Sequence, residues 1–113
     1  KRQLADPVAV VRALEGLVPR PDVTEVDLAL MSFAEQVILV RKTNAFVGAH
    51  GAALTHILLL PPGAGVVEIT PVPPPWPYRE SWNIYSNLAA WTGHSYRAVT
   101  TAGQVAEAAG AIL

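Results

Sequence analysis

The spacing of hydrophobic and polar residues changes several times along this chain. Some segments are apolar throughout or place apolar side chains three or four residues apart, as helices do, and these are residues 6–17, 33–43, 52–60, 80–92 and 101–112. Shorter segments alternate or are β-branched, as strands are, and these are residues 23–30, 45–47, 65–69 and 95–99. Strands that alternate with helices are typical of parallel sheets. The predicted fold class is therefore α/β, a Rossmann-like parallel sheet flanked by helices.

Short polar residues, glycines and prolines mark the ends of these segments. Ser32 and Glu35 have the spacing of a capping box before the helix of residues 33–43. Gly93 suits the C-terminal cap of the helix that precedes it. Five of the seven residues from 71 to 77 are proline, which predicts an extended loop.

The composition fits one domain with an apolar core. The 113 residues are 51% hydrophobic, and their eight Lys and Arg form no basic stripe, so nucleic-acid binding is disfavoured. The absence of cysteine excludes disulfides, thiolate nucleophiles and cysteine-type zinc sites. The most apolar run, residues 45–60, is shorter than the roughly 20 residues that span a bilayer. Because the chain begins with Lys1, we expect it to be a segment of a longer protein.

A glycine-rich loop between a predicted strand and a predicted helix carries the clearest chemical signal. Parallel sheets bind ligands at the carboxyl ends of their strands, where helix N-termini present free amide groups to anions. Gly48 and Gly51 would permit positive φ angles and a close approach of the backbone. We therefore expect a phosphate-binding loop over residues 48–53. Its spacing matches neither the dinucleotide fingerprint nor the P-loop, so a glycine-rich packing turn remains the alternative.

Two ionisable residues near this loop add to the expected chemistry. His50 can donate to a phosphate oxygen or offset leaving-group charge, and the alternative is an imidazole satisfied by backbone groups. Glu68 interrupts a buried strand, so its carboxylate needs a partner against the cost of desolvation. The expected partner is either a ribose hydroxyl pair or a nearby Arg or Lys. His56 is expected to pack or to lie on a helix surface.

The preceding strand-to-helix junction offers groups for a nucleoside pocket. Ser32, Phe33 and Gln36 lie there, although helix capping and core packing explain the first two equally well. An aromatic cluster surrounds the proline-rich loop and suits the apolar faces of sugars, with core or interdomain packing as the alternative. Its members are Trp76, Tyr78, Trp82 and Tyr85.

An ordered series of motifs in residues 2–71 resembles the carboxyl-terminal part of family 61 glycosyltransferases. The motifs are MSFAEQ at residues 31–36, FVGAHGAALTH at 46–56, LPPGA at 60–64 and VEI at 67–69. The family includes plant xylosyl- and arabinosyltransferases that decorate xylan and animal enzymes that add N-acetylglucosamine to O-mannose or to EGF-like domains. Two departures leave the donor and acceptor open: His56 stands where the family often has Asn, and Leu59-Leu60 replaces a hydrophobic-Phe pair.

The resemblance implies the carboxyl-terminal half of a two-domain GT-B fold. Residues 1–113 would form a single nucleotide-sugar-binding domain, inactive without a missing amino-terminal domain. The implied reaction is inverting, metal-independent transfer from a UDP-sugar such as UDP-xylose, UDP-arabinose or UDP-GlcNAc to a glycan or glycoprotein acceptor. It implies no other cofactor, and a location in the Golgi or endoplasmic reticulum lumen.

In such an enzyme His50 is the expected catalytic residue. The expected donor-binding residues are Ser32, Phe33, Gln36, Gly48, Ala49, Gly51, Ala52, Ala53 and Glu68. A non-catalytic interaction or assembly module with the same fold is the main alternative. A small Rossmann-type enzyme ranks last, because the chain lacks a dinucleotide fingerprint and has too few strands for two nucleotide halves.

Overall fold

A computed structural model describes residues 6–71, 73–76 and 83–113, with no side-chain description for Ala52. Its helices and strands follow one another as an alternating series, in which η denotes a 3₁₀-helix. They are α1 (Pro7–Glu15), η1 (Leu28–Leu30), α2 (Phe33–Arg41), β1 (Ala45–Ala49), η2 (Ala52–Leu59), β2 (Gly65–Ile69), α3 (Ile84–Thr92), β3 (Ser95–Val99) and α4 (Ala102–Ile112).

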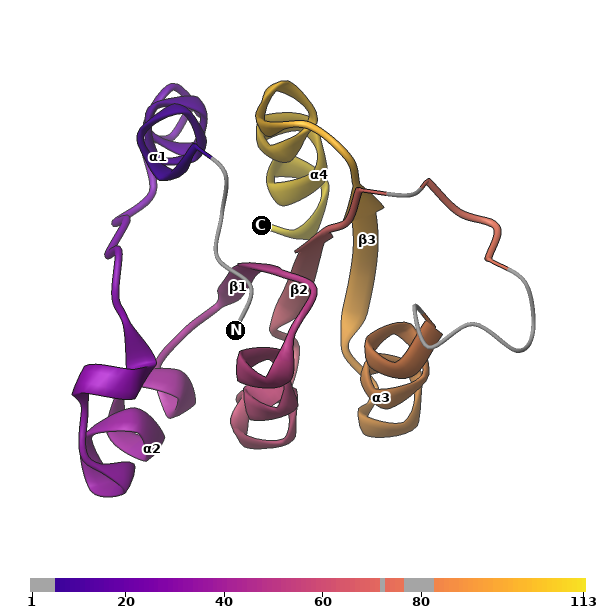
Figure 1. Ribbon diagram of the computed structural model, residues 1–113. Helices are drawn as coiled ribbons and strands as arrows, with labels where there is room; N and C mark the ends of the chain where they lie inside the picture. Colours follow the sequence, from indigo (N-terminus) through magenta and orange to yellow (C-terminus); the bar gives the residue numbers. More distant parts are fainter. Residues whose placement is uncertain (1–5, 72, 77–82) are drawn as a thin grey trace.

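The strands form a three-stranded parallel sheet in the order β1-β2-β3 (Figure 1). Both pairings are in simple register: Gly48 lies opposite Glu68 in β1 and β2, and Val66 lies opposite Tyr96 in β2 and β3. Parallel neighbours need crossover connections, and here η2 and α3 lie within those connections. The predicted α/β class with a parallel sheet flanked by helices is therefore confirmed.

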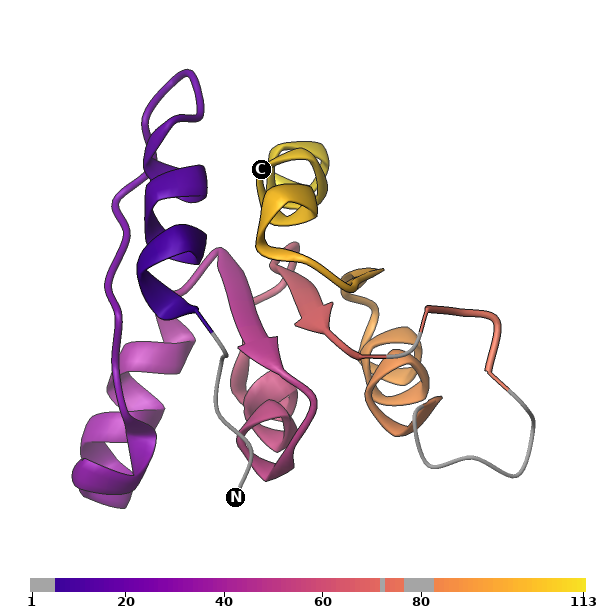
Figure 2. The same ribbon diagram turned by 45° about the horizontal axis from the view of Figure 1, so that its top comes forward.

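Helices cover both faces of the sheet. Figures 1 and 2 show α1 and α4 on one side and α2, η2 and α3 on the other. Alternate residues of β2 point to opposite faces, so Val66 and Glu68 face the α3 side, whereas Val67 and Ile69 face the α4 side.

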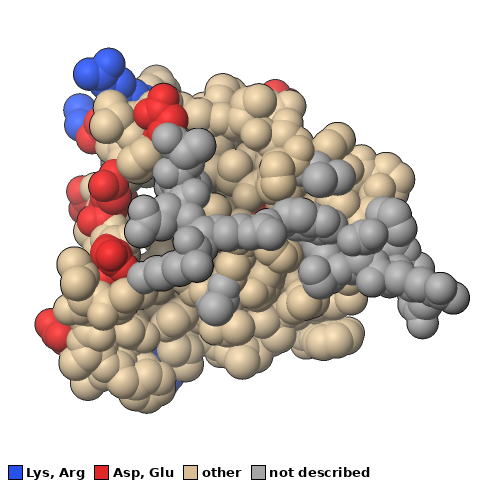
Figure 3. All heavy atoms as spheres, viewed as in Figure 1, with Lys and Arg blue, Asp and Glu red and all other residues tan. Residues whose placement is uncertain are grey.

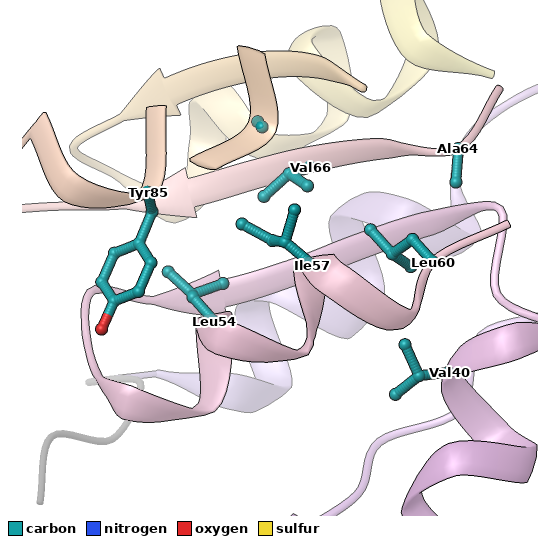
Figure 4. Packing of buried hydrophobic residues seen from close by; sticks show 8 residues of the cluster. Val40, Leu54, Ile57, Leu60, Ala64, Val66 and Tyr85 are labelled. Atoms are coloured by element: carbon teal, nitrogen blue, oxygen red, sulfur yellow. The ribbon is translucent and has the colours of Figure 1, made fainter. Parts of the chain in front are cut away.

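Each face has its own hydrophobic cluster. The α3-side cluster, much of it drawn in Figure 4, contains Val40, Leu54, Ile57, Leu60, Ala64, Val66, Tyr85 and Ala89. The α4-side cluster contains Val10, Leu14, Val67, Val99, Val105, Ala108 and Ala109. The central strand is thus enclosed on both faces.

The predicted helix caps are present. The Asp6 carboxylate accepts from the Ala9 amide at 3.0 Å, and Pro7 occupies the first turn of α1. Ser32 and Glu35 form the predicted capping box of α2. Gly93 ends α3 at φ 75°, a left-handed angle that favours glycine.

The predicted strand over residues 23–30 is wrong. Residues 23–27 have no regular secondary structure, and residues 28–30 form η1. The apolar positions of this segment face no sheet, since Val26 is 45% exposed and Leu30 is 85% exposed. The Asp27 carboxylate accepts from the Ala29 amide at 3.0 Å, a local bond that favours a turn over a strand ladder.

The other predicted elements are confirmed with shifted ends. β1 continues to Ala49, beyond the predicted end at Val47. α3 is described from Ile84, and the predicted start at residue 80 lies outside the described residues.

The helix predicted for residues 52–60 is a 3₁₀-helix. Its buried side chains explain this, because Leu54, Ile57 and Leu60 recur every third residue and are at most 7% exposed. A 3₁₀-helix has three residues per turn and so places all three on one face.

Candidate active site at the carboxyl end of β1

The loop after β1 has the strand-to-helix geometry that the sequence predicted. β1 ends at Ala49, and η2 begins at Ala52, directly after the N-cap residue Gly51. The His50 amide donates to the Ile69 carbonyl at 3.1 Å, which holds the loop against the end of β2. Residues 48–53 therefore lie at the carboxyl edge of the sheet, where parallel α/β proteins bind ligands.

The N-terminus of η2 has the character of an anion site. The amides of a first helical turn have no acceptor within the helix, and the backbone dipoles give this end a partial positive charge. Gly51 has no side chain to cap them, and no side-chain cap bond is present there. An oxyanion placed at this turn would accept from the amides of the loop.

The glycines of the loop do not adopt the positive φ angles that the sequence suggested, and their close approach to a ligand stays a prediction. Neither Gly48 nor Gly51 has a left-handed φ, and the glycines that do, among the described residues, are Gly63 and Gly93. Gly51 is extended at φ 164°, an angle open to any residue. A Cβ on Gly48 would lie 3.2 Å from Cδ2 of Leu54. Gly48 therefore gives the room in which η2 packs closely against β1.

Glu68 is fully buried on the α3 side of β2, with 0% exposure. Its Oε1 accepts from the Tyr96 hydroxyl, and its Oε2 is hydrogen-bonded to Nδ1 of His50. An ionised carboxylate only accepts, so Nδ1 of His50 carries the proton. The observed partners of Glu68 are thus a phenol and an imidazole, and no Arg or Lys pairs with it among the described residues. The ribose contact stays a prediction.

The sheet register brings these three residues together. Tyr96 lies opposite Val66, and Glu68 is two residues further along the same face of β2, within reach of a tyrosine side chain. Gly48 lies opposite Glu68 on the other side, and His50 follows two residues later. The loop after β1 and the strand β3 thus each send a side chain to the one buried carboxylate on β2.

Two tyrosines surround the pair formed by His50 and Glu68. The ring of Tyr85 on α3 contacts the His50 ring edge-on, with centroids 5.1 Å apart and planes at 69°. Burial, the hydrogen bond to Glu68 and the charge of Glu68 raise the pKa of the Tyr96 hydroxyl above its ordinary value. Burial, and then the charge of Glu68, raise the pKa of Tyr85. Both phenols therefore stay protonated beside the carboxylate.

Tyr96 is the site residue that the sequence analysis missed. It lies 28 residues after Glu68 and far from any motif. Only the register of β3 against β2 reveals it, and a single sequence does not contain that register.

Ser32 and Phe33 lie at the start of α2, as predicted, where Ser32 caps the helix and Phe33 is exposed to solvent. Ser32 is the N-cap of α2, and its amide donates to Oε1 of Glu35 at 2.9 Å. That backbone hydrogen bond lowers the pKa of the Glu35 carboxyl. Phe33 is 73% exposed, so the alternative of core packing is wrong for this ring. Their predicted contacts with a donor stay predictions.

Gln36 connects α2 to η2 through His56. Its Nε2 donates to the carbonyls of Leu28 and Met31 at 2.8 and 3.1 Å. Its Oε1 lies 2.9 Å from Nε2 of His56, whose Nδ1 lies 2.7 Å from the Ala53 carbonyl. His56 is half-buried, and it holds η2 to the segment before α2 rather than joining the contacts of Glu68.

The aromatic cluster expected around the proline-rich loop is only partly described. Tyr85 is buried in the α3-side cluster, where Figure 4 shows its hydroxyl directed away from Leu54 and Ile57. Trp76 is partly exposed. Tyr78 and Trp82 lie outside the described residues, so a sugar platform stays a prediction.

Charged side chains are unevenly distributed on the face drawn in Figure 3. Most of the acidic side chains visible there lie along the side formed by α1, the segment after it and α2. The described residues contain no group of three or more His, Cys, Asp or Glu that could hold a metal ion. None of the helices in the described part of the chain has the length and apolar character that a membrane crossing needs.

The fold and the loop define a Rossmann-like α/β protein with a strand-to-helix loop at the carboxyl edge of its parallel sheet. Residues 1–67 match the family described as Glycosyltransferase 61, and the chain belongs to that family. The resemblance noted from the sequence motifs is thus confirmed, and it places the chain in a class of enzymes, the glycosyltransferases.

Known relatives agree with this membership. The chain is 36% identical over 76 residues to the EGF domain-specific O-linked N-acetylglucosamine transferase of Drosophila melanogaster, covering 67% of this chain and 13% of that protein. It is 36% identical over 80 residues to the beta-1,2-xylosyltransferase of Arabidopsis thaliana, covering 71% of this chain and 14% of that protein. The chain thus spans about a seventh of the length of these relatives.

Proposed function

We propose that this chain is the donor-binding part of a glycosyltransferase that transfers a sugar from a UDP-sugar. The observation that carries the proposal is the loop of residues 48–53, in which an uncapped helix N-terminus and His50 meet at the carboxyl edge of a parallel sheet. Membership in the Glycosyltransferase 61 family supplies the reaction class. The remainder of a GT-B enzyme, with the acceptor side and the general base, would come from an amino-terminal domain.

In this proposal the loop stabilises the departing nucleotide. As the acceptor oxygen attacks the anomeric carbon from the opposite face, the bond from that carbon to the β-phosphate oxygen breaks, and UDP leaves with the negative charge. The loop amides and His50 would hydrogen-bond the diphosphate where this charge develops. Such contacts supply the stabilisation that a metal ion supplies in other transferases, so binding would be metal-independent.

The proposed donor-binding residues keep different roles. Gly48, Ala49, Gly51, Ala52 and Ala53 would offer backbone and a close approach. Ser32, Phe33 and Gln36 would line the nucleoside side, where the exposed ring of Phe33 suits stacking. Glu68 would act through His50 rather than on the ribose, because both of its oxygens accept bonds within the protein.

The names of the relatives suggest the sugar. Their names specify N-acetylglucosamine and xylose transfer. We propose UDP-GlcNAc or a UDP-pentose as donor, a glycan or glycoprotein as acceptor, and the Golgi or endoplasmic reticulum lumen as location.

One observation favours a second candidate, a non-catalytic interaction module. Large apolar side chains are exposed on the described surface, among them Leu30 at 85%, Phe33 at 73% and Trp91 at 79%. Surfaces of this kind contact other domains or subunits. An interaction module would keep the fold without holding a donor.

The experiment is a calorimetric titration of the chain with UDP, in Mg²⁺ and in EDTA. We expect equal affinity in both conditions and a loss of about 2 kcal/mol for His50→Asn, since hydrogen bonds to charged groups contribute roughly 1.5–3 kcal/mol. His94→Asn is the matched control. His94 precedes β3 at the opposite edge of the sheet and bonds the Ala64 carbonyl at 3.1 Å, so its replacement should leave UDP affinity unchanged.

The outcomes separate the two candidates. A folded chain that binds no UDP would reject the donor-binding role and favour the interaction module. Binding that His50→Asn and His94→Asn weaken equally would place the nucleotide away from the loop.

A further inference from the structure

We propose that Glu68 and Tyr96 are positioning residues that fix the ring and the tautomer of His50. The proton on Nδ1 stays on the Glu68 side of the ring, and Nε2 is the nitrogen that takes up a second proton and donates it in a hydrogen bond to a bound phosphate oxygen. This inference rests on the proposed function of the loop, and it assigns β3 a part in a site that the motifs confine to β1 and β2.

Glu68 is buried, and its carboxylate therefore depends on hydrogen bonds. A carboxylate without solvent is costly unless hydrogen bonds compensate it. At 0% exposure, Glu68 receives one bond on each oxygen, from Tyr96 on Oε1 and from His50 on Oε2. Each donor bonds one oxygen of the carboxylate. If the carboxylate rotated so that either oxygen left its donor, that donor would have no partner.

The hydrogen bond to Glu68 determines the tautomer of His50. The two ring nitrogens of histidine are distinct, and the bond made by one determines the chemistry of the other. Because Oε2 of Glu68 is an acceptor, Nδ1 of His50 keeps its proton and Nε2 is the position that exchanges one. Carboxylate–histidine pairs fix ring orientation in the same way at metal sites.

Tyr96 orients the carboxylate of Glu68. Its hydroxyl holds Oε1, and this fixes the plane of the carboxylate so that Oε2 faces the imidazole. Tyr85 contacts the His50 ring edge-on from α3, a packing contact that involves no bond to Glu68. His50 is therefore oriented from β2 and β3 through hydrogen bonds, and from α3 through packing alone.

The test is ¹⁵N NMR of the imidazoles in the intact chain, at a pH where His50 is neutral. The expected result for the wild type is a single Nδ1–H tautomer of His50. Glu68→Met removes both acceptors at similar length, so we expect the Nδ1–H population to fall and the Nε2–H form to appear. A wild-type His50 in the Nε2–H form would overturn the inference without any variant.

Tyr96→Phe and Tyr85→Phe form a matched pair, since each removes one phenol oxygen beside the same histidine. We expect Tyr96→Phe to give a mixed tautomer population and Tyr85→Phe to keep the wild-type signal. Val67→Ala, which lowers stability from the α4 side, should also keep it. If Tyr96→Phe behaves as Tyr85→Phe does, Tyr96 has no positioning role and that part of the inference is overturned.

A UDP titration of the same variants separates this inference from the proposed function. Loss of a partner behind a ligating histidine lowers metal affinity roughly 10–100-fold, and we expect about a tenfold loss of UDP affinity for Glu68→Met. If the tautomer changes and the affinity does not, positioning of His50 does not serve the ligand, and the inference is overturned. If the wild type binds no UDP, the proposed function fails, whereas the tautomer result can still be read.

Discussion

At the scale of single residues, Glu68 differs most from its surroundings. It is a fully buried carboxylate between Val67 and Ile69, and its partners among the described residues include no Arg or Lys. Removing one partner of such a group leaves a buried charge without compensation and costs more than the bond itself contributes. Tyr96 is a neutral donor among these partners, and its protonation becomes a condition of stability.

Tyr96 makes this condition measurable at alkaline pH. Its pKa is raised in the folded state above the ordinary value of 10.0. The unfolded chain therefore releases this proton first, and the contribution of Tyr96 to stability is complete below pH 10 and is lost as the pH rises through the raised pKa. We expect the free energy of unfolding to fall above pH 10, and to fall less steeply in Tyr96→Phe. Urea unfolding between pH 8 and pH 11 checks this.

Tyr85 is the comparison for that experiment. Its pKa is also raised, mainly by burial, so Tyr85→Phe should remove a further part of the alkaline slope. A constant difference between the wild type and Tyr96→Phe from pH 8 to pH 11 would contradict the prediction.

Part of the site could be predicted from single residues. The loop at residues 48–53 follows from two glycines and a histidine at a strand end, and Glu68 was identified as a carboxylate that needs a partner. Its actual partners could not be predicted, because they depend on strand register, which is set by packing between segments far apart in sequence. The room that Gly48 gives to Leu54 could not be predicted for the same reason, because it is a tertiary contact.

At the scale of elements, the helices were predicted best where a cap and a periodic face coincide. Asp6, Ser32 and Gly93 define ends that local chemistry determines. The strand predicted for residues 23–30 failed because alternation alone does not create a neighbouring strand, and the bond from Asp27 to the Ala29 amide favours a local turn. The 3₁₀ character of η2 could not be predicted, because most residues from 52 to 60 are apolar and only the burial of Leu54, Ile57 and Leu60 reveals the three-residue spacing.

The contact between β2 and α4 offers a prediction at this scale. A Cβ on Gly65 would lie 2.0 Å from Cγ2 of Ile112, so the start of β2 and the end of α4 approach too closely for any side chain at position 65. We expect Gly65→Ala to lower the free energy of unfolding by about 1–3 kcal/mol, the usual cost of overpacking. Chemical denaturation measures it.

A double-mutant cycle identifies the cause. Ile112→Ala removes the clashing methyl groups, so the double variant should lose less stability than the sum of the two single variants, with a coupling of roughly 0.5–3 kcal/mol. Additive losses would mean that Gly65→Ala acts on the strand itself and not on α4.

At the scale of the whole molecule, β2 is the centre of the fold. It pairs with β1 and β3 and carries a hydrophobic cluster on each face. Local opening involves the least enclosed segments first. We expect the slowest amide hydrogen exchange of the described residues in β2, with faster exchange in η1 and the segment before it. Mass spectrometry of peptides after exchange would detect this, and slower exchange in α1 than in β2 would contradict it.

The residues of the proposed site lie on one face of the sheet, and the other face is covered by packing helices. His50, Glu68, Tyr85 and Tyr96 all meet on the α3 side, and α1 and α4 cover the other side. The layer formed by α1 and α4 can therefore be varied for thermostability while the residues of the proposed site stay unchanged. Gly110 of α4 is a natural first position, because a Cβ there would make an ordinary contact of 3.5 Å with Leu17. The melting temperature of this fold can therefore be raised from the α4 side without replacing any residue of the proposed site.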